Sequence, residues 1–205
     1  MPRIIIPEII VSRLPVYLRE LRHMQVLGKQ TTSSQELGEQ IGVSAAQIRK
    51  DLSQFGEFGK QGTGYNIAFL VEKLTGILHI EHIWDVAVVG MGDMGHAIAR
   101  YQGFNGRGFR VAMLFDNDPA KVGTIVGKFT IQDSADIIPV IREASIRVAV
   151  LCVPVSAAQI VTNDLVQAGV KAILSYSPIN LSVPKGVRVQ YLDPSIGLQR
   201  MTYHL

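Results

Sequence analysis

The chain has 205 residues, a length that suits one large domain or two small ones. Hydrophobic residues make up 47% of it and charged residues 18%, which favours packed globular structure and excludes an intrinsically disordered chain. The net charge of +3 permits nucleic-acid binding without requiring it.

Signals for targeting, disulfides and metals are few. No apolar run approaches the roughly 18 residues of a membrane-spanning helix, and residues 2–7 lack the length and cleavage site of a secretory signal. The single cysteine, Cys152, excludes an internal disulfide, and we interpret it as a small apolar residue within a buried strand. The five histidines show no metal-ligand spacing. We therefore expect a cytoplasmic protein with no membrane partner and no metal.

The first 75 residues have helical spacing of apolar residues and few strand signals. A first helix is expected to begin near Ser12, with Pro15 tolerated in its first turn. Ser33 or Ser34 can cap a second helix, which Gly42 ends.

A third helix follows closely on the second. Ser44 and Gln47 fit a capping box, in which each side chain bonds a free backbone N–H of the other residue, and the helix continues through residues 48–53. Two short helices in this order predict a helix-turn-helix. Aromatic residues alternate with glycines over 55–65, which predicts a short hairpin or wing, and Asn66 can cap the next helix.

The pattern changes near residues 76–82, where β-branched runs begin to alternate with helical segments. Val86 to Val89 form a strand pattern that leads into Gly90-Met91-Gly92-Asp93-Met94-Gly95, and a helix pattern follows to Arg100. Gly90 permits a tight turn, Gly92 lets the backbone approach a pyrophosphate, and Gly95 lets the helix pack on the strand. The anion would lie at the helix N-terminus. An ordinary Gly-rich strand-to-helix turn is the alternative.

A second strand, residues 109–115, ends in Asp116, near the offset at which an acidic residue meets a ribose 2′-hydroxyl. A carboxylate there can accept ribose hydroxyl bonds and repel the 2′-phosphate of NADP, which predicts NAD over NADP. A solvated turn aspartate is the alternative.

Further strands are expected at 147–154, 170–175 and 187–191, with 129–131 in a side role. Together they predict a Rossmann, doubly wound parallel sheet, whose ligands bind at the carboxyl ends of the strands.

Several motifs occur in a fixed order: Ser-Arg-Leu-Pro-Val-Tyr-Leu-Arg at 12–19, Gln-Ile-Arg-Lys-Asp-Leu-Ser-Gln-Phe-Gly at 47–56, Gly-Thr-Gly-Tyr at 62–65, the 90–95 turn, Phe-Asp-Asn-Asp-Pro at 115–119 with Lys-Val-Gly at 121–123, Val-Pro at 153–154 and Ser-Pro at 177–178. In this order and spacing the chain resembles the Rex family of redox-sensing transcriptional repressors. The resemblance implies a homodimer that binds double-stranded operator DNA, with NADH or NAD⁺ as regulatory ligand. NADH would close the dimer and release the DNA.

The resemblance also implies three parts of the chain. These are a winged-helix DNA-binding domain at 1–80, a Rossmann NAD(H)-binding domain at 81–192, and a C-terminal helix at 193–205 that is exchanged between subunits.

The predicted DNA contacts lie on and around the third helix. Arg49 and Lys50 would reach the major groove, where an arginine can bond guanine O6 and N7 with a discrimination of roughly 1–3 kcal/mol; a solvated helix face is the alternative. Ser53 and Arg13 would contact phosphates, and Lys60 the minor groove or its phosphates. The full predicted set is Arg13, Ser44, Gln47, Arg49, Lys50, Ser53 and Lys60.

The predicted cofactor contacts are Gly90, Met91, Gly92, Asp93, Met94, Gly95, Tyr101, Asp116, Pro154 and Asp193. In the family, the positions of Tyr101 and Asp193 pair across the dimer near the nicotinamide; a core tyrosine and a helix-capping aspartate are the alternatives. Pro194 stands where many relatives have a larger apolar residue, so we expect no ring contact with the nicotinamide from that position.

Two other function classes are compatible with the sequence. An NAD-dependent oxidoreductase with an appended DNA-binding module would need a general acid or base, and no histidine pairs with a carboxylate in a catalytic pattern; no catalytic residue is predicted. A CoA-binding regulator remains possible because a similar Gly-rich turn can hold CoA.

Overall fold

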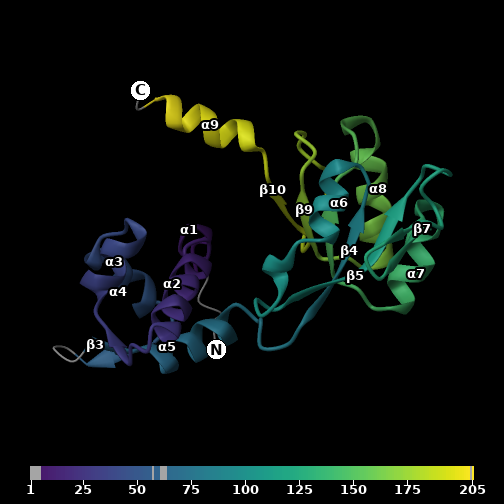
Figure 1. Cartoon of the computed structure of the whole chain (residues 1–205). Helices are drawn as coiled ribbons and strands as arrows, with labels where there is room; N and C mark the ends of the chain where they lie inside the picture. The colour runs from purple at the N-terminus through teal and green to yellow at the C-terminus, as the bar shows by residue number, and fades with distance from the viewer. Residues whose placement is uncertain (1–5, 57, 61–63, 204) are drawn as a thin grey trace. The chain divides into compact units, whose positions relative to one another are not determined.

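The computed structural model describes residues 6–56, 58–60, 64–203 and 205, which form two compact units, Met1–Glu81 and His82–Leu205. Figure 1 shows helices gathered in the first unit and a sheet flanked by helices in the second. Among the residues described, no helix is both long and apolar enough to cross a bilayer.

The first unit is mainly helical. Its elements are α1 (Glu8–Val11), α2 (Leu14–Val26), β1 (Thr31–Thr32), α3 (Ser34–Ile41), α4 (Ala45–Ser53), β2 (Gly59–Lys60), β3 (Gly64–Asn66) and α5 (Ile67–Ile77). One apolar cluster joins these helices; its fully or almost fully buried members are Leu14, Tyr17, Leu18, Leu21, Met24, Leu37, Ile48, Leu52, Ile67, Leu70 and Leu74. The helix expected to begin near Ser12 is α2, which begins at Leu14 with Pro15 in its first turn, and the short helix α1 before it was not predicted.

The helix-turn-helix is confirmed, and two glycines explain how tight it is. Gly42 ends α3 with a positive φ of 71°, a conformation that glycine adopts without steric cost. Gly38 lies inside α3, and a Cβ there would collide with the backbone oxygen of Val43. The turn before α4 can therefore pack directly on α3.

The caps of the helices follow the sequence in part. The Ser33 and Ser44 hydroxyls accept from backbone N–H groups three residues on, at 3.0 and 3.2 Å. The return half of the expected capping box is wrong, because the Gln47 side chain bonds Asp51 instead of the Ser44 backbone. Asn66 caps α5 by accepting from the Phe69 N–H at 2.9 Å, as expected.

The expected wing is present as a small antiparallel sheet in the order β1-β3-β2, with Gly59 opposite Tyr65. The turn residues 61–63 lie outside the described residues.

The second unit is a doubly wound sheet, as predicted. Its elements are β4 (Trp84–Val89), α6 (Asp93–Ala99), the 3₁₀ helix η1 (Gln102–Phe104), β5 (Phe109–Asp116), β6 (Ile125–Val126), β7 (Phe129–Asp133), the 3₁₀ helix η2 (Ser134–Asp136), α7 (Ile137–Glu143), β8 (Val148–Leu151), α8 (Val155–Ala168), β9 (Ala172–Ser175), β10 (Arg188–Tyr191) and α9 (Pro194–Thr202). The strand order is β10-β9-β8-β4-β5-β7-β6, and only the β6–β7 pair is antiparallel.

The central strand β4 separates two apolar cores. Ala87 and Val89 belong to the core that includes α7 and α8, whereas Val86 and Val88 belong to the core that includes Ile98 of α6. This alternation is the period of two that a strand imposes on its side chains. The chain leaves β4 towards β5 and later returns to β8 on the other side. The strand order therefore reverses between β4 and β8, which is where such sheets bind ligands.

Candidate cofactor and DNA-binding sites

The turn after β4 can be built only with glycine at two of its positions. Gly90 has a φ of 92°, its N–H donates to the Phe115 oxygen at 2.8 Å, and a Cβ on it would lie 2.6 Å from the Cys152 oxygen. A Cβ on Gly95 would collide with the Gly90 oxygen. Gly92 is different, because no atom lies within 4 Å of its Cβ position. This open space at the start of α6 is where a dinucleotide could approach the backbone.

Asp116 faces this turn from the end of β5. Its carboxylate accepts from the backbone N–H groups of Met91 at 2.6 Å and Asp118 at 2.8 Å, and Lys121 Nζ lies 3.3 Å away. Burial opposes ionisation, but these bonds outweigh it and lower the pKa of Asp116. Asp116 is therefore a buried anion that fixes the Gly-rich turn, and its predicted contact with a ribose stays a prediction.

Asp118 is the more accessible carboxylate at this strand end. Its side chain is 44% exposed, against 6% for Asp116. Asp118 accepts from the Ala120 N–H at 2.9 Å, and Lys121 Nζ lies 3.8 Å from it. An acceptor for a ribose hydroxyl is therefore available here as well as at Asp116.

The first turn of α6 supplies free donors. The N–H groups of Asp93 and Met94 are among the first of the helix and have no partner within it. The Met91 N–H is already bonded to Asp116, and its side chain is buried. The Asp93 carboxylate is negative, so this residue would meet a phosphate through its backbone only.

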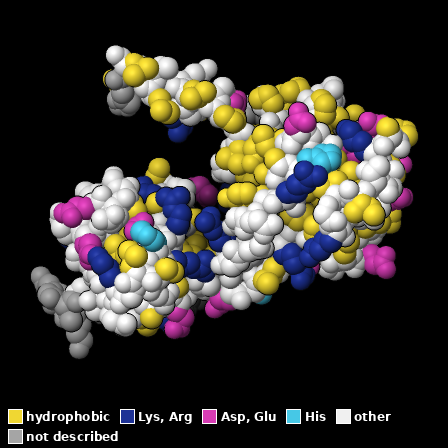
Figure 2. Space-filling view, in the orientation of Figure 1, with side chains coloured by type: hydrophobic (Ala, Val, Ile, Leu, Met, Phe, Trp, Pro, Cys, Tyr) yellow, Lys and Arg dark blue, Asp and Glu magenta, His cyan; other side chains and the backbone are white. Residues whose placement is uncertain are grey.

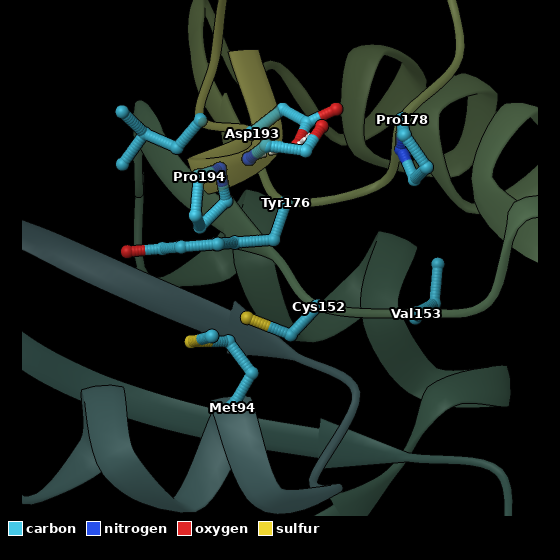
Figure 3. Close-up of a pocket in the computed structure, with 9 residues that line it drawn as sticks. Met94, Cys152, Val153, Tyr176, Pro178, Asp193 and Pro194 are labelled. Carbon is cyan, nitrogen blue, oxygen red and sulfur yellow. Dashed lines mark hydrogen bonds between the residues drawn. The ribbon is translucent and has the colours of Figure 1, made fainter. Parts of the chain in front are cut away.

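A cavity of about 530 Å³ lies at the carboxyl ends of β8 and β9, beside α6. It is lined by Met94, Cys152, Val153, Tyr176, Pro178, Leu192, Asp193, Pro194 and Ser195. Figure 3 shows Met94 and Cys152 on one side of the Tyr176 ring and Pro194 on the other. Ser177 ties the two strand ends together, because its hydroxyl donates to the Val153 oxygen at 2.6 Å. The open Gly92 turn and this cavity together suit the shape of a dinucleotide.

The floor of the cavity carries no charge at neutral pH. Burial raises the pKa of the Cys152 thiol to about 12, and burial followed by the nearby Cys152 and Tyr101 raises the pKa of Tyr176. The expected placement of Cys152 within a buried strand is wrong, because β8 ends at Leu151 and the thiol lines the cavity. β8 thus ends three residues before the expected end at Pro154, although the Cys152 N–H still donates to the Val89 oxygen at 2.8 Å.

Tyr101 and Asp193 each make a separate local contact within the chain. Tyr101 is 52% exposed and packs edge-on against Phe104, with ring centroids 5.1 Å apart. Asp193 caps α9 by accepting from the Ser195 N–H at 2.8 Å and from its hydroxyl at 2.7 Å. Pro154 is exposed at the start of α8. Their predicted cofactor contacts stay predictions.

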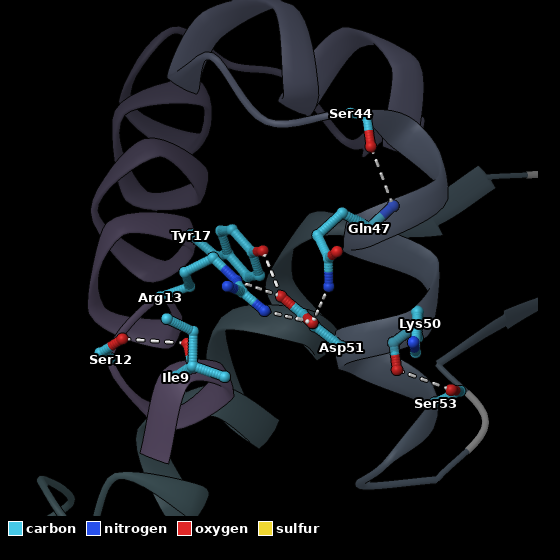
Figure 4. A network of polar contacts seen from close by, with 9 residues as sticks. All are labelled: Ile9, Ser12, Arg13, Tyr17, Ser44, Gln47, Lys50, Asp51 and Ser53. Carbon is cyan, nitrogen blue, oxygen red and sulfur yellow. Dashed lines mark hydrogen bonds and ion pairs between the residues drawn. The ribbon is translucent and has the colours of Figure 1, made fainter. Parts of the chain in front are cut away.

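In the first unit, a buried carboxylate on α4 gathers four donor atoms (Figure 4). Arg13 Nε and Nη2 bond Asp51 at 2.6 and 2.8 Å, Tyr17 donates its hydroxyl at 2.6 Å, and Gln47 Nε2 donates at 2.6 Å. The Asp51 side chain is fully buried. Burial opposes its ionisation, but the bonds from Arg13, Tyr17 and Gln47 lower its pKa. Sequence reasoning predicted none of these contacts for Arg13, whose phosphate contact stays a prediction.

The other predicted DNA contacts lie on the exposed side of α4. Arg49 and Lys50 are exposed, and Arg49 Nη1 donates to the Ser34 hydroxyl at 2.9 Å. Ser53 donates its hydroxyl to the Lys50 oxygen at 2.8 Å, so the side chain lies along the helix. The side chain of Lys60, predicted to reach DNA from the wing, lies outside the described residues.

Comparison with known proteins identifies the family. The chain is 52% identical over 199 residues to the redox-sensing transcriptional repressor Rex of Roseiflexus sp. (strain RS-1), covering 97% of this chain and 90% of that protein. It is 42% identical to the Rex of Brevibacillus brevis (strain 47 / JCM 6285 / NBRC 100599), covering 98% and 97% of the two chains. The chain belongs to the Rex family of redox-sensing transcriptional repressors. Rex proteins are transcriptional regulators, which places this chain among regulators and not among enzymes.

Solved structures of a Rex-family repressor agree over the whole chain. The crystal structure of RSP in complex with β-NAD⁺ and operator DNA has a TM-score of 0.92 and 36% identity, covering 98% of this chain and 93% of RSP. The complex of RSP with β-NADH has a TM-score of 0.89 and 34% identity, covering 98% and 95%. The family models divide the Rex chain in a similar way: one described as a putative DNA-binding protein N-terminus matches residues 5–53, and one described as a CoA binding domain matches 81–179.

Sequence reasoning did not assign Asp51 or Tyr176 to the candidate sites, and it did not place Cys152 in the cavity. Tyr176 directly precedes the Ser-Pro motif at 177–178, and its position after a predicted strand could have placed it at the ligand edge. Nothing local singles out Asp51, because an acidic residue on a short helix is usually exposed.

Proposed function

We propose that this protein is a repressor that binds operator DNA as a homodimer through its helix-turn-helix and that NADH binding to the second unit releases the DNA. The observation that carries this proposal is the near-complete structural agreement with RSP, which has been solved both with β-NAD⁺ and operator DNA and with β-NADH. The residues of this chain fit both ligands. The open Gly92 turn leads to a cavity with an uncharged floor, and α4 presents Arg49 and Lys50 outwards.

The cavity supports a preference for the reduced cofactor. When bound, the nicotinamide ring supplies the redox signal, since it is cationic in NAD⁺ and neutral in NADH. Moving a cation into a largely apolar cavity costs free energy unless a partner neutralises it. The floor residues Met94, Cys152 and Tyr176 provide no charge, and the Asp193 carboxylate, which also lines the cavity, is bonded to Ser195 at the start of α9. NADH therefore fits the floor better than NAD⁺ does.

Release of DNA requires that NADH bind one state of the dimer more tightly than the other. A change from mostly open to mostly closed needs a difference of about 5.5 kcal/mol. We propose that the pairing of Tyr101 with Asp193 of the second copy contributes to this difference. Tyr101 lies in the second unit, and its half-exposed side chain is available for such a contact.

The homodimer is supported by α9. None of its residues is buried, and Leu198 and Met201 are 63% and 66% exposed. Figure 2 shows exposed apolar side chains along this helix. An exposed apolar helix of this kind is typical of an interface element, and exchange of residues 193–205 between two copies would cover it. A cytoplasmic location stays a prediction.

CoA is the competing ligand, because the family model of the second unit carries that description. Calorimetry with NADH, NAD⁺ and CoA separates the two readings. We expect NADH to bind most tightly; binding of CoA with no binding of NADH would overturn the proposed cofactor.

The proposed function is tested by operator binding at fixed salt across a series of NADH/NAD⁺ ratios, because DNA affinity changes steeply with salt. The operator fragment is selected from a random duplex pool with the full chain. We expect the bound fraction to fall as NADH rises at constant total cofactor. Equal binding with and without saturating NADH would contradict the proposal.

A further inference from the structure

We propose that Asp51 is a positioning residue for DNA reading, which holds the Gln47 amide with Nε2 inward so that Oε1 faces the base edges as a hydrogen-bond acceptor. The inference rests on the proposed function, since it assumes that α4 enters the major groove. It assigns a base preference to Gln47 and a role to a buried residue that does not touch DNA.

The orientation of the Gln47 amide follows from the charge of its partner. Asp51 is ionised, held so by Arg13 and Tyr17, and an ionised carboxylate can only accept hydrogen bonds. The Gln47 atom that lies 2.6 Å from Asp51 Oδ1 must therefore be the amino group. The carbonyl oxygen occupies the other branch of the planar amide. Within the described part of the chain no donor bonds it.

The position of Gln47 on α4 places this oxygen where bases are read. Gln47 is the third residue of the helix, after the N-cap Ser44, and is partly buried; Figure 4 shows its amide beside Asp51. The N-terminal residues of a recognition helix are those that contact base edges. Asp51 lies one turn further along α4 and is buried against α2 through Arg13 and Tyr17. The same carboxylate thus anchors the helix and sets the direction of the amide.

An acceptor at this position selects among bases. In the major groove, adenine N6 and cytosine N4 donate hydrogen bonds, whereas guanine O6 and N7 and thymine O4 only accept them. Gln47 is therefore expected to favour adenine or cytosine over guanine or thymine at one position of each half-site. A single hydrogen bond of this type discriminates by about 2- to 12-fold.

The test uses the full chain and an operator selected with the wild type, in which each base pair of one half-site is replaced in turn by the other three. Competition binding at fixed salt gives a preference profile for each variant. We expect Gln47→Ala to lose the adenine or cytosine preference at one position only. Asp51→Asn is expected to lower the same preference towards the Gln47→Ala level, because a neutral amide can both donate and accept and no longer fixes Gln47.

Two matched variants make the result specific. Tyr17→Phe removes one donor to Asp51 but leaves the carboxylate beside Gln47, so its profile should match the wild type. Arg49→Ala should change a different position, and unchanged preferences elsewhere in the Asp51→Asn profile show that the unit is folded. If Asp51→Asn binds no fragment, the wild-type and Gln47→Ala profiles still decide which bases Gln47 prefers.

The inference is overturned if the position lost in Gln47→Ala prefers guanine or thymine, or if Asp51→Asn keeps the full preference there. These outcomes differ from a failure of the proposed function, in which the wild-type chain would select no duplex or would bind it independently of NADH.

Discussion

Two buried carboxylates hold the parts of the molecule that we expect to meet its ligands. Asp51 bonds side chains from α2 and α4, and Asp116 bonds the backbone of the Gly-rich turn. Each is buried, and each stays charged because several donors surround it. Neither contact is visible from the residue type alone.

Asp116→Ala tests whether this residue positions the turn or reads the ribose. Because its oxygens bond Met91 and Asp118, we expect NADH and NADPH affinities to fall together, by about 5- to 30-fold for one or two lost bonds. Calorimetry with both cofactors measures the ratio. Asp118→Ala is the matched variant, and we expect it to reduce the difference between the NADH and NADPH affinities. If the ratio of NADH to NADPH affinity changed in Asp116→Ala and not in Asp118→Ala, the ribose contact would belong to Asp116.

Arg13 offers a second test at the level of one side chain. Its guanidinium is bonded to Asp51 through two nitrogens, so we expect Arg13→Gln to weaken operator binding without changing the salt dependence. Lys50→Gln, which removes an exposed cation, should reduce the slope of log K against log salt by about 0.9. Binding titrations at four salt concentrations give both slopes. An equal reduction for Arg13→Gln would support the predicted phosphate contact.

At the scale of the elements, α9 is a helix with no buried residue within its own chain. Its Pro194, Leu198 and Met201 recur at intervals of four and three residues, which places them on one helix face. The structure leaves this face exposed, whereas the apolar faces of α2 and α5 are buried in the first unit. A partner for α9 is therefore expected outside the unit described.

Leu198→Asp places a charge in the middle of this face. We expect it to convert the dimer to monomer in sedimentation velocity at micromolar concentration and to weaken operator binding, because two half-sites are no longer held together. Gln199→Asp, on the neighbouring side of the same helix, is the control and should remain dimeric. A Leu198→Asp variant that stays dimeric would place the interface elsewhere.

At the scale of the whole molecule, each unit carries one of the two buried anions. A carboxyl whose pKa is lower in the folded state stabilises the protein above its unfolded pKa of about 3.9. This contribution is lost as the pH falls through the folded pKa. Both units are therefore expected to lose stability over the same acidic range.

Thermal unfolding between pH 3 and pH 7 measures this loss. We expect the first unit of Asp51→Asn to be less stable than that of the wild type at pH 7, and its stability to change less between pH 5 and pH 3. The unfolding of the second unit, followed with saturating NADH, should keep the wild-type pH dependence. An unchanged acid sensitivity of the first unit in Asp51→Asn would contradict the role of this carboxylate.

The sequence by itself determined the features that depend on near neighbours in the chain. The caps at Ser33, Ser44 and Asn66 and the αL end at Gly42 arise from bonds or steric limits within a few residues. Local geometry decides them, so a single sequence suffices.

Only the tertiary structure decided which distant groups meet. Asp51 lies 38 residues from Arg13, Asp116 lies 25 from Met91, and the cavity joins the ends of two strands to the start of α9. The same residue types would be solvated if the chain passed elsewhere. Burial removes the water around these side chains, and a neighbouring group takes its place. That neighbour, and not the residue type alone, sets the charge, direction and role of each side chain.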